Sequence, residues 1–92
     1  MTPLETVRSE LARYRHRLLD FDAEERADGA IELLIRLRVA VAGAHTYRAP
    51  IHPRDIENPQ FAWTFQGFLY DCVHDYMVEL FQHTPQSLDA PQ

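Results

Sequence analysis

The chain has 92 residues, of which 46% are hydrophobic, and its formal net charge at pH 7 is −5. This length predicts a single domain, and this apolar content excludes a chain that is disordered throughout. The negative charge disfavours binding to nucleic-acid backbones and anionic membranes, and it favours basic partners.

The charge distribution and the single cysteine further limit the class of protein. All nine basic residues are arginine, and after Arg54 the chain holds six acids and no basic residue apart from histidine. The single cysteine, Cys72, excludes an internal disulfide, and no run of signal-peptide type is present, so we expect a cytoplasmic protein. No stretch approaches the about 18 uninterrupted apolar residues of a membrane span, so we expect no membrane partner.

The first predicted helix covers residues 3–19. Thr2 is suited to cap it, and Pro3 is suited to its first turn. Apolar residues at alternating spacings of three and four predict a narrow seam against one neighbour. The arginines of this segment scatter around the helix with Glu5 and Glu10 interleaved, a pattern that argues against a nucleic-acid surface.

The second predicted helix covers residues 23–42, with Asp22 and Glu25 spaced as a capping box and Gly43 suited to its C-terminal cap. Its apolar residues fall on two sides of the helix, and each side must be covered. Either the first and third helices cover both sides, or a second copy of the chain covers one. On the second alternative, the dimer interface consists of Ile31, Ile35, Val39 and Ala42.

Residues 43–58 are expected to form an irregular connection that contains Pro50, Pro53 and two histidines of unassigned role, His45 and His52. Asn58 and the proline after it then predict the start of a third helix at residues 59–82. Residues 84–92 read as a disordered polar tail. The domain is therefore predicted to span residues 1–83.

The third helix carries the most information. Apolar residues at spacings of three and four cover a broad arc, and Asp71, Asp75 and Glu79 recur every four residues beside it. Like charges at this spacing repel, so the acids indicate a cation opposite, either from the first two helices or from a basic partner. Aromatic residues at the margin of the arc suit an interface, unless the preceding loop folds over them. The predicted partner-binding residues are Trp63, Tyr70, Asp71, Asp75, Glu79 and Phe81.

Sequence signals for metal binding or catalysis are weak. Asp71, His74 and Asp75 have a spacing that metal ligands use on one helix, but the motif has one copy where a di-metal bundle uses two. Cys72 falls within the apolar arc, which indicates a buried thiol. We find no glycine-rich phosphate loop and no nucleophile elbow, so we predict no catalytic residue and no cofactor.

Together these patterns predict an all-α fold: an antiparallel helical hairpin and a long C-terminal helix, completed as a homodimeric bundle. The predicted function is a small acidic, non-enzymatic protein-interaction module that acts as an adaptor, regulator or accessory subunit. One alternative is an acidic inhibitor or immunity-type protein that blocks a basic site on its partner. Another is a metal-dependent helical-bundle enzyme.

Overall fold

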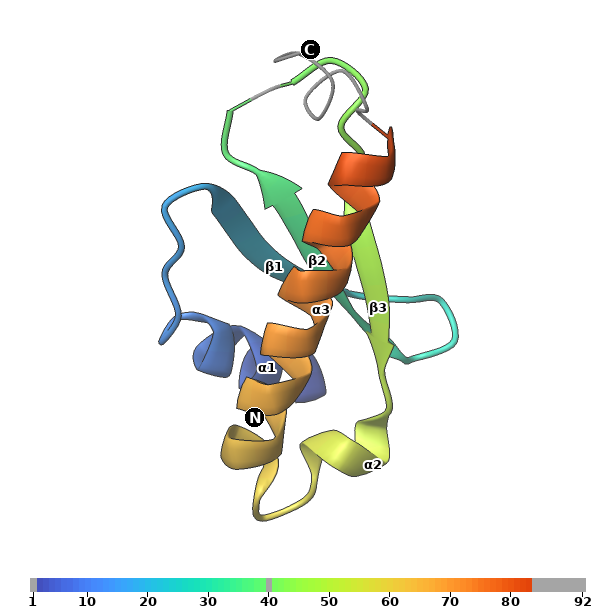
Figure 1. The fold of residues 1–92 in the computed structure, drawn as a ribbon. Helices are drawn as coiled ribbons and strands as arrows, with labels where there is room; N and C mark the ends of the chain where they lie inside the picture. The colour runs from blue at the N-terminus through green and yellow to red at the C-terminus, as the bar shows by residue number, and fades with distance from the viewer. Residues whose placement is uncertain (1, 40, 84–92) are drawn as a thin grey trace, which may run out of the picture.

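The chain has an α+β fold, in which helices are combined with one antiparallel sheet (Figure 1). The computed structural model describes residues 2–39 and 41–83, and six elements follow one another within these ranges. They are α1 (Pro3–Leu11), β1 (Leu19–Glu25), β2 (Ile31–Leu37), β3 (Tyr47–Ile51), α2 (Pro53–Ile56) and α3 (Phe61–His83). The predicted all-α fold and helical bundle are therefore wrong, and the predicted tail at 84–92 lies outside the described residues.

Residues 19–37 form a β-hairpin where two helices were predicted. β1 alternates apolar and acidic residues, and β2 places an apolar residue at every second position. Side chains of a strand point alternately to its two faces, so this period of two buries one set against the helices. β1 pairs antiparallel with β2 from Leu19↔Leu37 to Glu25↔Ile31.

The turn between β1 and β2 shows why a helix does not run from 23 to 42. Gly29 has a φ of 87°, which L side chains rarely adopt, and its N–H donates to the C=O of Arg26 at 2.9 Å. Asp28 accepts a hydrogen bond from the N–H of Ala30 at 3.1 Å. The turn from Arg26 to Gly29 thus reverses the chain, and cross-strand pairing replaces helical hydrogen bonds.

α1 begins where the sequence indicates but ends at Leu11 instead of residue 19. The Thr2 hydroxyl accepts from the N–H of Glu5, and the Glu5 carboxylate accepts from the N–H of Thr2, both at 3.1 Å. This capping box fixes the start of the helix. Asp22, predicted to cap a second helix, lies in β1 instead, where its carboxylate accepts from the N–H of Ala23 at 2.7 Å.

The connection at 43–58, predicted to be irregular, contains β3 and α2. β3 pairs antiparallel with β2 and completes the sheet order β1-β2-β3. Pro50 of β3 pairs with Glu32 of β2, whose N–H and C=O groups point toward β1. The β2–β3 ladder therefore has no hydrogen bond at this position, and the missing N–H of Pro50 costs none. His52 caps α2 by accepting from the N–H of Arg54 at 3.0 Å.

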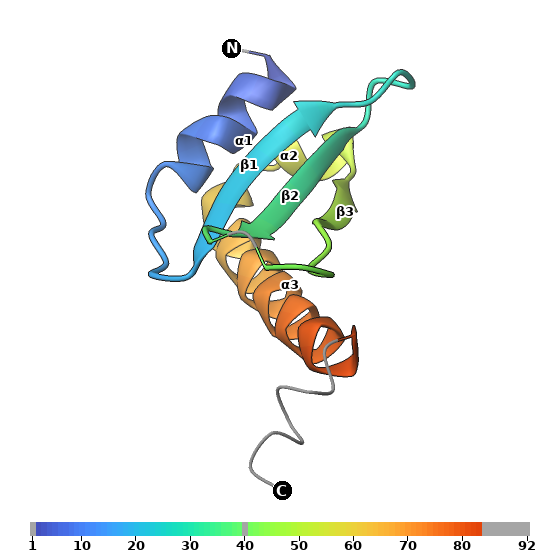
Figure 2. The same cartoon turned by 90° about the horizontal axis from the view of Figure 1, so that it is seen from above.

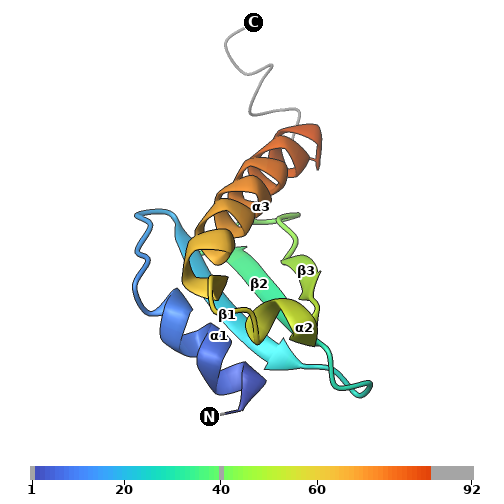
Figure 3. The ribbon, with the colours of Figure 1, turned by 90° about the horizontal axis from the view of Figure 1, so that it is seen from below.

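α3 crosses one face of the sheet, and the sheet lies over it when seen from above (Figure 2). Figure 3 shows α1 and α2 on either side of the start of α3. Residues from all these elements meet in one hydrophobic core, including Val7 of α1, Leu33 of β2, Ile56 of α2 and Tyr76 of α3. A single apolar layer between sheet and helices therefore holds the domain together.

The opposite face of the sheet carries charged residues. Arg48 donates to Glu24 at 2.8 Å and to Glu32 at 3.1 Å across the three strands. Leu34 is buried on this face, at 4% exposure, between Asp22 and Arg48 in the strand register. This face offers solvent a charged surface, so it does not need a covering layer.

Candidate functional site

α3 is attached to the sheet by a narrow stripe of its surface. Its buried residues are spaced four, four, three and four apart, and at about 100° per residue they cover one side of the helix. They are Phe61, Phe65, Leu69, Cys72 and Tyr76. The Tyr76 hydroxyl donates to the C=O of His45 at 2.6 Å, which ties the loop before β3 to the helix.

A second stripe runs along the opposite side of α3, about 180° around the helix from the first. Its residues are spaced four, three, four, four and three apart, and all are exposed. This outer stripe consists of Trp63, Gly67, Tyr70, His74, Val78 and Phe81. The exposed fractions are 74% for Trp63, 57% for Tyr70, 50% for Phe81 and 40% for Val78. Within the described ranges, the loop before α3 does not cover these aromatic residues.

Between Trp63 and Tyr70 the outer stripe is hollowed into a shallow groove of about 650 Å³. Gly67 lies between the two rings, and a Cβ added to it meets no atom within 4 Å. Tyr70 is held by Gln66, which donates to its hydroxyl at 3.2 Å, and by an edge contact with Tyr14 at 6.5 Å between ring centroids. One wall of the groove, Tyr70, is therefore positioned by its neighbours.

The acids predicted to face a cation meet no arginine. Glu79 lies 2.7 Å from His45, and Asp75 accepts from the Tyr47 hydroxyl at 3.4 Å, which is a long hydrogen bond. Asp71 is exposed at the edge of the groove. In the described ranges, the ion pairs of arginine are made with acids of α1 and of the β1–β2 hairpin. The first two predicted helices thus do not supply the cation.

The structure does not bring the four predicted dimer residues together. Ile31 and Ile35 are buried in the core of the chain, while Val39 and Ala42 are exposed in the segment after β2. They were grouped on one side of a helix that is in fact a strand and a turn, where Gly43 adopts a φ of 86°. Ile31 and Ile35 are not accessible to a second copy.

The residues considered for metal binding or catalysis do not form a site either. In residues 2–39 and 41–83, no group of three or more His, Cys, Asp and Glu side chains is placed to hold a metal ion, and Asp71, His74 and Asp75 lie exposed along α3. Burial raises the pKa of the Cys72 thiol and also that of the Tyr47 hydroxyl. Both groups are therefore protonated near neutral pH, and Cys72 is not an activated thiolate.

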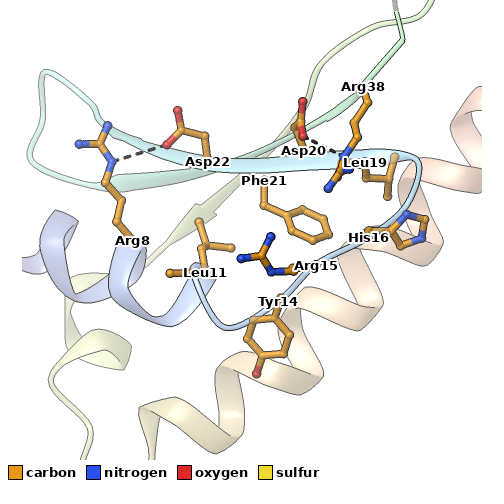
Figure 4. A pocket seen from close by; sticks show the side chains of 11 residues that line it. Arg8, Leu11, Tyr14, Arg15, His16, Leu19, Asp20, Phe21, Asp22 and Arg38 are labelled. Atoms are coloured by element: carbon orange, nitrogen blue, oxygen red, sulfur yellow. Dashed lines mark hydrogen bonds and ion pairs between the residues drawn. The ribbon is translucent and has the colours of Figure 1, made fainter.

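A second concavity lies at the outer edge of β1, where α1 and the segment 12–18 face the strand (Figure 4). This β1-edge cleft has a volume of about 440 Å³. Its lining combines arginine, aspartate and apolar side chains: Arg8, Leu11, Ala12, Tyr14, Arg15, His16, Leu19, Asp20, Phe21, Asp22 and Arg38. All of these residues except Arg38 lie within residues 8–22, and strand pairing brings Arg38 of the segment after β2 beside them.

Sequence reasoning identified Trp63, Tyr70 and Phe81 but not the other members of the outer stripe. Gly67, His74 and Val78 continue the same spacing of three and four, which is the signal that was available for them. That these residues bind a partner stays a prediction.

Comparison of the chain with protein-family models, with curated proteins and with solved structures finds no match. No helix in residues 2–39 and 41–83 is long and apolar enough to cross a membrane.

Proposed function

We propose that the domain is a non-enzymatic protein-interaction module, and that the outer stripe of α3 binds an amphipathic helix of a basic partner protein. The observation that supports this proposal is the set of exposed large apolar residues, Trp63, Tyr70, Val78 and Phe81, on the side of α3 that does not pack on the sheet. Apolar surface that stays in water gains nothing for the fold, whereas covering it by a partner is favourable. Trp63 and Tyr70 are residue types that dominate the energetics of interfaces.

The shape of the outer stripe fits a helix. From Trp63 to Phe81 the stripe rises about 27 Å along the axis, at 1.5 Å per residue. Alternating spacings of three and four are also those of seams between packed helices. Gly67 places a hollow between two aromatic rings, into which a side chain of the facing helix can insert. The surface therefore suits a straight partner helix of about five turns.

Charge favours a basic partner over a second copy of this chain. Asp71 lies at one margin of the outer stripe, Asp75 lies on the same flank of α3 between this margin and the sheet, and α3 carries no arginine or lysine. In an antiparallel pair of α3 helices related by a two-fold axis, this margin faces its own copy, and the acids repel. A partner with arginine or lysine on that side replaces this repulsion with attraction.

Photo-crosslinking in the native cell tests the position of the partner. We expect a photoreactive phenylalanine analogue at position 67 to give a defined protein adduct, and the same analogue at position 24, on the charged face of the sheet, to give none. Trp63→Ser should abolish the adduct at 67. Leu18→Ser removes an apolar residue of similar exposure outside α3, and it should leave the adduct unchanged.

Equal adducts at positions 67 and 24, or an adduct of two copies of this chain, would contradict the proposal. Charge reversal then tests the chemistry of the partner. Asp71→Lys together with Asp75→Lys should prevent crosslinking, while two reversals away from α3, Glu24→Lys and Glu25→Lys, should not. The adduct should also weaken at high salt, because exposed charge pairs are screened.

We also propose that the protein is cytoplasmic, because its single cysteine is a buried free thiol.

A further inference from the structure

The outer edge of β1 leaves one residue open for main-chain pairing. Antiparallel strands alternate between residue pairs that exchange two hydrogen bonds and pairs that exchange none. Arg26 donates to Ala30 at 2.7 Å and Arg38 donates to Leu18 at 2.9 Å, so the even-numbered residues of β1 are bonded to β2. The odd-numbered residues therefore direct their N–H and C=O groups away from β2, toward the β1-edge cleft.

Two arginines close this edge on either side of Phe21. The guanidinium of Arg8 donates to the C=O of Ala23 at 2.9 Å, and Nε of Arg38 donates to the C=O of Leu19 at 3.3 Å. Phe21 lies between them, and within residues 2–39 and 41–83 no group pairs with its N–H or C=O. A long strand cannot add to this edge, but a single residue can.

The charges of the β1-edge cleft leave one guanidinium without a counter-ion. Asp22 lies 3.5 Å from Arg8, and Asp20 lies 3.2 Å from Arg38. No acid of the described ranges pairs with Arg15, whose side chain lies between α1 and β1 in Figure 4. The cleft is thus complementary to a ligand with one negative charge.

Apolar and aromatic side chains form part of the cleft's lining, beside its charged groups. Leu11, Tyr14 and Phe21 line it, and the ring of His16 meets the ring of Phe21 edge-on at 6.5 Å. Tyr14 is anchored against Phe65 of the core at 6.3 Å. A volume of about 440 Å³ lies within the range of sites for small ligands.

We propose that the β1-edge cleft binds a carboxylate that is attached next to an amide N–H, as in the C-terminal residue of a peptide. The ligand N–H donates to the C=O of Phe21, and one carboxylate oxygen accepts from the N–H of Phe21. The other oxygen accepts from the guanidinium of Arg15, a charge-assisted hydrogen bond. The ligand side chain then lies against Leu11 and Tyr14. This site shares no residue with the outer stripe of α3, although Tyr14 of its lining contacts Tyr70, and it does not depend on the proposed function.

Titration of the ¹⁵N-labelled protein with acetyl-threonyl-valyl-leucine, followed by NMR, tests the site. We expect a saturable shift of the Phe21 amide signal. The same peptide with a C-terminal amide should bind at least about tenfold more weakly, because it lacks the charge that Arg15 recognises. N-acetylleucine should also bind, and its affinity relative to the tripeptide tells whether the ligand is a free acid or a chain end.

Arg15→Gln should weaken binding about tenfold, whereas Arg17→Gln, the same charge change two residues away and outside the cleft lining, should change it less than about twofold. Arg15 is exposed, so the fold should be kept, which the spectra report directly. Equal binding of acid and amide, or equal loss in the two variants, would overturn the proposal. So would the absence of a saturable shift at Phe21 at millimolar concentrations of both ligands.

Discussion

Both sides of α3 carry large apolar residues, yet one side meets the sheet and the other meets solvent. The buried stripe is attached to a core shared with α1, α2 and the strands, whereas the outer stripe touches few residues outside α3. The difference shows that the spacing of apolar residues predicts that a helix face packs against something, but does not identify what it packs against. Substitutions on the two sides should therefore have opposite consequences for stability and binding.

The largest contrast is expected between Phe65 and Phe81. Phe65→Ala removes a buried ring that contacts Tyr14, Phe61 and Phe68, so the free energy of unfolding should fall by about 3–5 kcal/mol. Phe81→Ala truncates an exposed ring and should change it by less than about 0.5 kcal/mol. Urea denaturation measures both, and similar losses would show that the outer stripe is part of the core.

A smaller contrast is expected for two tyrosine hydroxyl groups. Tyr76→Phe leaves the His45 C=O without its 2.6 Å donor, so stability should fall by about 1 kcal/mol or more. Tyr70→Phe removes an exposed hydroxyl that only accepts from Gln66, and it should cost less than about 0.5 kcal/mol. If thermal unfolding gave the reverse order, the loop before β3 would not be tied to α3 as described.

Gly67→Ala should raise the stability of the fold and lower the affinity for the partner. Alanine is favoured over glycine inside a helix, and nothing lies within 4 Å of the added Cβ, so stability should rise by about 0.5–1 kcal/mol. The methyl group fills the hollow of the outer stripe, so capture of the partner should weaken. A loss of stability on urea denaturation would mean that another part of the chain occupies the groove.

The smallest effect should come from the thiol on the buried side. Burial raises the pKa of Cys72 above its ordinary value of 9.0, so the native state retains this proton where the unfolded state loses it. Stability should therefore be unaffected below this pH and should decrease as the pH rises above it. Cys72→Ala lacks this titration, and its unfolding free energy should vary less between pH 8 and pH 10. Equal slopes for the two proteins would contradict the burial of the thiol.

The sequence predicted part of α3 and the start of α1 because their signals are local. Thr2 and Glu5 form their capping box without help from the rest of the chain, and the long apolar pattern of α3 has one period. The hairpin was missed although its signals were present. Leu33, Leu34 and Leu37 fit a helical spacing, which concealed the period of two and the Asp28-Gly29 turn.

The candidate sites were less accessible to sequence reasoning than the fold. Trp63 and Tyr70 could be singled out by residue type, but the pattern does not show which arc of α3 the sheet covers. The β1-edge cleft joins Arg8, Arg15 and Arg38 through strand pairing. This arrangement depends on the register of the β1–β2 hairpin. Because helices were predicted for these residues, the arrangement could not be foreseen.

The two edge strands of the sheet, β1 and β3, affect whether further strands can add to it at high protein concentration. An open strand edge is a template on which further chains add and grow into fibrils. At β3, Pro50 presents no N–H to an incoming strand, and at β1 the side chains of Arg8 and Arg38 occupy the carbonyl groups that such a strand needs. Addition of a further strand is therefore disfavoured at these positions of the two edges.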